Sequence, residues 1–145
     1  MASGDTQRAQ MLAEVSQGAA RSARNGDASE KWVLSRGCDP VMAKRSLQML
    51  PPMVGNAQME VTTEDEAFFT KLKERKWDVV FFAPGACRWS QAKQPIPGGN
   101  AQTRGWSLDH YYKAVRELQG DHVKIVGTAE ERLIVPSLRE ALGLK

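Results

Sequence analysis

The stretch WDVVFFA, residues 77–83, restricts the fold of this chain more than any other part of its sequence. Residues 79–82 are apolar without a break and consist of valine and phenylalanine, which favour strands. Successive side chains of a strand point to opposite faces, so an unbroken apolar run indicates a strand that is buried on both faces. Such strands are typical of parallel sheets covered by helices on both sides, which is the arrangement we predict.

Two further segments complete a repeating pattern of strand and helix. We predict strands at 57–62, 78–83 and 122–127, with amphipathic helical segments after each of them. The connections are long enough to return each strand parallel to the previous one. The predicted fold class is therefore α/β, with a small three-stranded parallel, Rossmann-like sheet and flanking helices. Residues 57–145 resemble a truncated doubly wound domain in this respect.

The first third of the chain is predicted to be helical. Residues 5–24 carry an apolar stripe at helical spacing, formed by Leu12, Val15, Ala19 and Ala23. Residues 29–36 are interpreted as a short helical turn. A further helix begins after Asp39, a capping residue, and is expected to end at the Pro51-Pro52 pair. We expect residues 1–56 to form a helical N-terminal extension that packs on the α/β domain of residues 57–145.

Composition limits the classes of function. The chain has 145 residues, of which 41% are hydrophobic and 26% charged, as in one ordinary globular domain. The net charge of +3 is spread without a basic block, so nucleic acid is not expected as a partner, and no membrane is expected because no apolar run is long enough to span a bilayer. We expect a cytoplasmic protein, with import into an organelle as the alternative, because the first residues are rich in Ala, Ser and Arg. Two separated cysteines and two histidines indicate no metal, and the glycines form neither GxGxxG nor a phosphate loop, so no cofactor is expected.

Ligands of open parallel sheets bind beyond the carboxyl ends of the strands, and three loops lie there. Two of them run directly into acidic residues, and we interpret them as capping boxes, Thr63 with Glu66 and Thr128 with Glu131. The third loop, residues 84–107, contains no acidic residue and is far longer than an ordinary connection. We therefore expect the functional site in this loop.

The loop combines positive charge, flat apolar side chains and glycine turns. The predicted ligand-binding residues lie in it or directly after it: Arg88, Trp89, Lys93, Arg104, Trp106, Ser107 and His110. An alternative is that the two tryptophans pack under the loop as a small satellite core.

Cys87 is the candidate for catalysis. A cysteine directly after a parallel strand, in "CRWSQAK", resembles the nucleophile position of cysteine phosphatases and sulfurtransferases. Those phosphatases place an arginine six residues after the cysteine, where this chain has Lys93. A buried and inert thiol is the commoner role for a single cysteine.

Three hypotheses follow for the function. In the first, the loop 84–107 binds an anionic small molecule at the carboxyl edge of the sheet. In the second, the same Trp- and Arg-rich loop binds a protein partner, because these residue types dominate interface hot spots. In the third, Cys87 is the nucleophile of a thiol-dependent enzyme. A homo-oligomer is compatible with each of them, because a three-stranded sheet is thin.

Overall fold

A parallel sheet forms the centre of the protein, as the computed structural model, which describes residues 26–144, shows. Its four strands lie in the order β3-β2-β4-β5, and every neighbouring pair is parallel. In chain order the strands are β2 (Trp32–Arg36), β3 (Gln58–Thr62), β4 (Val79–Phe82) and β5 (Lys124–Gly127). The predicted α/β class is confirmed, with one strand more than expected.

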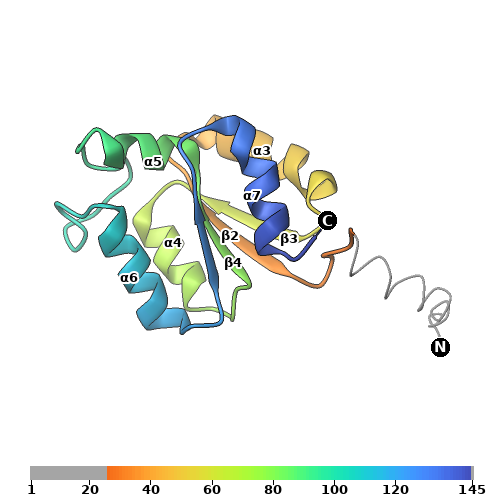
Figure 1. The fold of residues 1–145 in the computed structure, drawn as a ribbon. Helices are drawn as coiled ribbons and strands as arrows, with labels where there is room; N and C mark the ends of the chain where they lie inside the picture. Colours follow the sequence, from red (N-terminus) through yellow and green to blue (C-terminus); the bar gives the residue numbers. More distant parts are fainter. Residues whose placement is uncertain (1–25, 145) are drawn as a thin grey trace, which may run out of the picture.

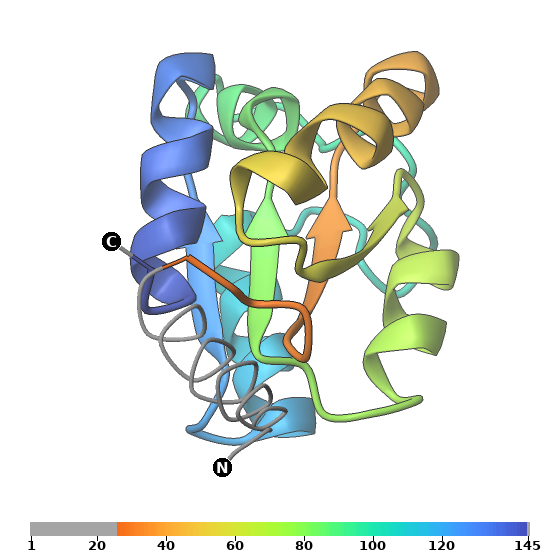
Figure 2. The same ribbon diagram turned by 90° about the vertical axis from the view of Figure 1, so that its right-hand side faces the viewer.

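Helices cover both faces of this sheet (Figures 1 and 2). One face carries α3 (Pro40–Met53) and α7 (Ile134–Ala141), and the other carries α4 (Asp65–Leu72) and α6 (Leu108–Gln119). The shorter α5 (Pro84–Gln91) follows β4 at the carboxyl edge, and the 3-10 turn η1 (Glu131–Leu133) precedes α7. None of the described helices has both the length and the apolar character needed to cross a membrane.

The additional strand lies in the centre of the sheet. Residues 32–36 pair with β3 on one side and with β4 on the other, so the helical turn predicted at 29–36 is wrong. The prediction failed because Ser35 and Arg36 interrupt the apolar pattern, although both are buried. The predicted helix at residues 5–24 lies outside the described residues.

Strand β4 divides the core into two parts, as its unbroken apolar sequence indicates. Val79 and Phe81 point to the α3/α7 face, whereas Val80 and Phe82 point to the α4/α6 face. All four side chains are at most 2% exposed. Burial of these apolar side chains is the main term that stabilises the sheet, because each is worth roughly 1.5–3 kcal/mol.

Helix α3 begins as predicted but continues further. The side chain of Asp39 accepts a hydrogen bond from Val41 N at 2.9 Å, and Pro40 occupies the first helical position. The helix includes Pro51 and Pro52 and ends at Met53, so the predicted end at the prolines is wrong.

Two apolar side chains of α3 are exposed. Val41 is 68% and Leu47 41% exposed, whereas Leu50 is buried. Helix α3 therefore turns less of its apolar surface to the core than its sequence indicates.

Neither of the two predicted capping boxes forms. Helix α4 starts one residue later than expected, with Glu64 as the cap, because Asp65 is drawn into the interior. Thr128 Oγ1 accepts a hydrogen bond from Glu130 N at 3.1 Å within a local turn and does not cap η1. Pro136 lies in the first turn of α7, directly after η1, where a missing N–H costs little.

Candidate functional site

A buried ion pair closes the carboxyl edge on the α4/α6 side of the sheet. The last residue of β2, Arg36, contacts Asp65 at the start of α4 at 2.8 Å, and both side chains are 0% exposed. The hydroxyl of Tyr111 in α6 donates to the second carboxylate oxygen of Asp65 at 2.6 Å. The guanidinium group also donates to the carbonyl oxygens of Gly37 and, at 2.8 Å, of Pro97. These bonds satisfy charges that would otherwise be costly to bury.

The same cluster holds down the long loop. Arg36 binds the carbonyl of Pro97, and the Asp65 amide donates to the carbonyl of Gly98 at 2.8 Å. Gly98 has a φ of +87°, and a Cβ there would collide with the carbonyl oxygen of Thr63, so glycine is required at this close approach. Burial and the Asp65 carboxylate raise the pKa of Tyr111 to about 12. The loop is therefore an anchored segment of the fold.

The structure separates the two loop tryptophans. Trp106 packs edge-on against Tyr111, with ring centroids 5.2 Å apart, and against Phe69 at 6.1 Å. It thus adopts the satellite-core arrangement that we considered as an alternative. Trp89, on α5, is 41% exposed and keeps its ring available at the surface.

Several predicted ligand-binding residues have structural contacts. Ser107 is the N-cap of α6, and its amide donates to Nδ1 of His110 at 3.0 Å, which fixes both residues at the start of the helix. Lys93 ends the turn after α5 with a φ of +58°. Lys93 and Ser107 border one open hollow, whereas Arg104 borders another. The proposed role of these residues in binding stays a prediction.

Cys87 is buried, with 3% exposure, and its Sγ lies 3.4 Å from the carbonyl oxygen of Phe82. Burial raises the pKa of its thiol from 9.0 to about 11, against the opposing effects of the Thr128 backbone and Arg88. A nucleophilic cysteine needs a lowered pKa and access. Its catalytic role stays a prediction, and both the geometry and the pKa argue against it.

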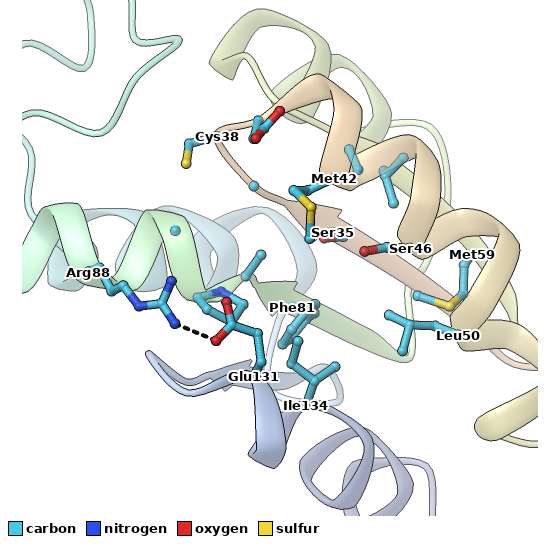
Figure 3. Close-up of a pocket in the computed structure, with 17 residues that line it drawn as sticks. Ser35, Cys38, Met42, Ser46, Leu50, Met59, Phe81, Arg88, Glu131 and Ile134 are labelled. Atoms are coloured by element: carbon cyan, nitrogen blue, oxygen red, sulfur yellow. Dashed lines mark hydrogen bonds and ion pairs between the residues drawn. The ribbon is translucent and has the colours of Figure 1, made fainter.

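A cavity of about 250 Å³ lies on the other face, at the carboxyl ends of β2 and β4. This is the switch point of the sheet, because the chain leaves β2 for β3 on one side and returns to β4 on the other. Apolar side chains of the sheet and of α3 and α7 form most of the wall, among them Met42, Leu50, Phe81 and Ile134 (Figure 3). We call this space the switch-point cavity.

Ser35 is the most informative residue of the switch-point cavity. Its side chain lies at the cavity wall, near Ser46 of α3 (Figure 3), and Ser35 is only 6% exposed. The backbone carbonyl of Ser35 accepts a bond from Thr62 Oγ1 at 2.7 Å, but its own hydroxyl has no hydrogen-bond partner among residues 26–144. A buried hydroxyl without a partner costs about 1–3 kcal/mol, and such exceptions in a native fold need an explanation. A bound ligand would supply the missing partner.

The N-terminus of α5 supplies a second polar element. The cavity is lined at this point by Ala83, Pro84 and Gly85. The first hydrogen bond within the helix runs from the Cys87 amide to Ala83 O, at 3.1 Å. The Gly85 amide precedes Cys87 and so has no hydrogen-bond partner within the helix. The first turn of α5 contains no acidic residue that would interact with the positive end of the helix dipole. A Cβ on Gly85 would collide with Cys38 Sγ, so glycine allows the two loops to meet at the cavity.

An ion pair lies at the edge of the cavity. Arg88 of α5 contacts Glu131 of η1 at 2.6 Å, and both side chains are largely exposed (Figure 3). Each partner favours the charged form of the other: the hydrogen bond to Arg88 lowers the pKa of Glu131, and the bond to Glu131 raises the pKa of Arg88. Arg88 is thus the only one of the predicted ligand-binding residues in the described chain that borders the switch-point cavity.

Sequence patterns did not predict the part of the switch-point cavity that β2 and α3 contribute. Ser35 was assigned no role because residues 29–36 were interpreted as a helical turn, and Cys38 and Ser46 carry no local signal. The available signal for the strand was the order of residues 32–39: the partly apolar WVLSR followed by glycine, cysteine and a capping aspartate, which is how a strand ends and a helix begins.

Comparison with protein-family models, with curated proteins and with solved structures finds no match for this chain. Among residues 26–144, no group of three or more His, Cys, Asp or Glu side chains could hold a metal ion. The fold alone defines the class: a small α/β protein of Rossmann-like type, with a parallel sheet covered by helices on both faces. Its particular feature is the cavity at the switch point, beside a serine hydroxyl that has no hydrogen-bond partner among the described residues.

Proposed function

We propose that this protein binds a small anionic molecule with an apolar body in the switch-point cavity. The observation that carries the proposal is the buried hydroxyl of Ser35, which lies at the cavity wall and has no partner in the described chain. The proposal keeps the anionic ligand expected from the sequence. It moves the site from the long loop to the opposite side of α5.

The size and wall of the cavity indicate the body of the ligand. A dry engineered cavity of about 150 Å³ binds benzene, so about 250 Å³ is sufficient for a substituted ring or a short branched chain. The side chains of Met59, Val61 and Phe81 form an apolar floor on the sheet. Apolar contact with this floor would contribute to the affinity for a ligand, and the polar groups would determine the orientation of the ligand.

The charges around the cavity indicate the polar end of the ligand. One carboxylate oxygen of Asp39 accepts a hydrogen bond from Val41 N at the start of α3, and the carboxylate of Glu131 is paired with Arg88. The positive end of α5 has no such partner. A carboxylate or phosphate group would accept bonds from the Gly85 amide and the Ser35 hydroxyl, which is the usual anion-binding geometry of a helix N-terminus.

Four probe compounds with one aromatic ring each test this proposal by NMR: benzoate, phenyl phosphate, benzyl alcohol and toluene, each titrated into the ¹⁵N-labelled full chain. We expect the two anions to shift the amide signals of Ser35 and Gly85 with a dissociation constant of about 1 mM, benzyl alcohol to bind more weakly, and toluene weakest of all. If all four compounds leave these signals unchanged at tens of millimolar, the proposal is wrong.

A matched pair of variants separates binding in the cavity from binding elsewhere. Ser46→Leu fills the cavity from α3 and should abolish the response to benzoate. Gln48→Leu adds the same side chain to an exposed position of the same helix and should leave the response unchanged. Equal effects of the two variants would place the anion outside the cavity.

A second candidate function rests on Trp89. Its 41% exposure fits the protein-interaction hypothesis, because exposed tryptophan is enriched at interface hot spots. Under this hypothesis Trp89→Ala abolishes binding to a protein partner and leaves the benzoate response unchanged.

A further inference from the structure

Strand β5 forms one edge of the sheet, because it pairs only with β4 in the described chain (Figure 2, blue strand). The Lys124 amide donates to Asp78 O at 3.0 Å, so the backbone groups of Lys124 point toward β4. Backbone groups alternate in direction along the strand, and those of Ile125 and Gly127 therefore point away from the sheet. β5 thus presents a short row of donors and acceptors that a further strand can pair with.

The helices on the two faces leave this edge accessible. An open hollow runs along β5, between Arg116 of α6 and the side chains of Ser137 and Ala141 of α7. Serine and alanine are short, so they leave room for a strand to approach. Arg116 covers only the beginning of the edge, where its Nη1 donates to Val123 O at 2.6 Å.

The edge is complementary to a second copy of itself. When two copies of β5 pair antiparallel about a two-fold axis, Ile125 of one copy can lie opposite Gly127 of the other and exchange both backbone hydrogen bonds with it. This register pairs every outward group of the two strands. It places Val126 on the axis, opposite Val126 of the second copy, with their Cα atoms about 4.5 Å apart. Such a pair of valines is a favourable apolar contact.

The charges near the ends of β5 fit the same register. Lys124 is exposed and lies opposite the uncharged Thr128 of the second copy. Glu130, two residues after Thr128, lies diagonally across from Lys124, within reach of a long side chain. The Glu130 side chain is 54% exposed, and its contact with Arg132 is an exposed pair, which is weak. The two-fold axis repeats the contact of Lys124 with Glu130 of the other copy.

The opposite edge of the sheet lacks this complementarity. Strand β3 pairs only with β2, and the Gln58 amide donates to Lys31 O at 2.8 Å. The outward groups of β3 are therefore those of Met59 and Val61. Their pairing about a two-fold axis would place Glu60 opposite Glu60 of the second copy. Like charges directly opposite each other destabilise a pair of strands, so β3 is unsuited to pairing with its own copy.

From this difference between the two edges, we propose that two copies of the chain pair antiparallel through β5. The two sheets then form one continuous sheet. The axis is perpendicular to the sheet, so α6 of one copy lies on the same face as α6 of the other, and the α7 helices lie together on the opposite face. The pairing does not depend on any ligand.

A single cysteine on the axis tests the pairing. In a Cys38→Ser/Cys87→Ala background, Val126→Cys should form a disulfide between copies in oxidised glutathione, because the expected separation of the Cα atoms suits a disulfide. Glu60→Cys places the matched cysteine at the centre of β3 and should give about tenfold less covalent dimer at the same protein concentration. Slow amide exchange of Val80 in both variants shows that the sheet is intact.

Charge reversal tests the same register at exposed positions. Analytical ultracentrifugation of the full chain should show a dimer whose dissociation constant rises about tenfold in Lys124→Glu, because both charge contacts become repulsive. The double variant Lys124→Glu/Glu130→Lys should restore the native value. Within one copy the extended strand separates the two residues, so this rescue requires contact between copies. Lys73→Glu makes the same change on α4 and should leave the dissociation constant unchanged.

A chain that sediments as a monomer at millimolar concentration would overturn the proposal. Equal amounts of covalent dimer from Val126→Cys and Glu60→Cys, or a double charge variant that dimerises no better than Lys124→Glu, would also overturn it, because another surface would then join the copies. Slow exchange of the Ile125 and Gly127 amides in a monomeric chain would contradict it as well, since a different segment would then cover the edge.

Discussion

The two faces of the sheet differ in how completely they are filled. On the α4/α6 face, Phe82 lies in an aromatic cluster with Phe68, Tyr111 and Tyr112, and the Arg36–Asp65 ion pair is fully buried. On the α3/α7 face the side chains are smaller, a cavity remains at the carboxyl edge, and the Ser35 hydroxyl is unpartnered in the described chain. The first face is closely packed, whereas the second retains a cavity of about 250 Å³.

Removal of the Arg36–Asp65 ion pair is expected to destabilise the α4/α6 face most strongly. Asp65→Ala leaves Arg36 buried without its counter-charge, and we expect a loss of about 3–5 kcal/mol in the free energy of unfolding. Urea denaturation measures this loss. The exposed pair of Arg132 with Glu130 provides the control, since Glu130→Ala should change the midpoint little. A small loss for Asp65→Ala would mean that Arg36 reaches water.

The two cysteines distinguish the faces chemically. Cys87 belongs to the filled face, and because its pKa lies near 11 instead of 9.0, we expect alkylation by iodoacetamide at pH 8 about a hundredfold more slowly than for an ordinary thiol. Cys38 is only partly buried at the cavity and should react first. Mass spectrometry of the two peptides across pH 7–11 measures both rates. Fast alkylation of Cys87 near pH 7 would instead support its role as a nucleophile.

The raised pKa of Cys87 also predicts how stability depends on pH. The folded state holds the thiol proton more tightly than the unfolded state, so this contribution to stability is complete below about pH 9. It is lost as the pH rises toward about 11. Urea midpoints between pH 8 and 11 should fall less in Cys87→Ala than in the native chain, and parallel curves would contradict the assignment.

Phe81 and Phe82 of β4 point to opposite faces of the sheet, so their substitution allows a direct comparison of the two faces. Phe82→Ala should cost about 1 kcal/mol more than Phe81→Ala, because Phe82 contacts three aromatic rings whereas Phe81 borders the cavity. Both losses are read from urea denaturation. An equal or reversed order would mean that the cavity side is packed as tightly as the aromatic side.

The smallest expected effect concerns the ion pair at the edge of the cavity. Glu131→Gln removes a negative charge beside the site and releases Arg88, so benzoate should bind about twofold more tightly, with less difference at high salt. Benzyl alcohol, which is neutral, should bind as it does to the native chain. Weaker benzoate binding in this variant would show that Glu131 is needed to position Arg88.

Sequence patterns predicted the parts of the fold whose signal is local. The apolar run of β4 and the Asp39-Pro40 helix start can each be recognised within a few residues. Strand β2 could not, because a buried arginine is acceptable only with its partner Asp65, 29 positions later. Acidic residues after Thr63 were taken as a cap for the same reason, since nothing local shows that Asp65 points inward.

The predicted site and the switch-point cavity lie at the same edge of the sheet but involve mostly different residues. The rule that ligands bind at the carboxyl ends of strands depends only on the parallel topology, and it identified Arg88 and the residues after β4. The cavity exists because α3 lies over Ser35 and Phe81 without filling the space between itself and the sheet. The width of this gap depends on packing between segments that are far apart in the chain.

The most direct test of the switch-point cavity as a binding site is to measure stability and benzoate binding together in Ser35→Ala. We predict that this variant is at least as stable as the native chain, by up to about 1 kcal/mol, because a buried hydroxyl without a partner has been removed. Benzoate should bind about tenfold more weakly, because one of its hydrogen-bond donors is lost. A clear loss of stability with unchanged benzoate binding would contradict the assignment of this cavity as the ligand site.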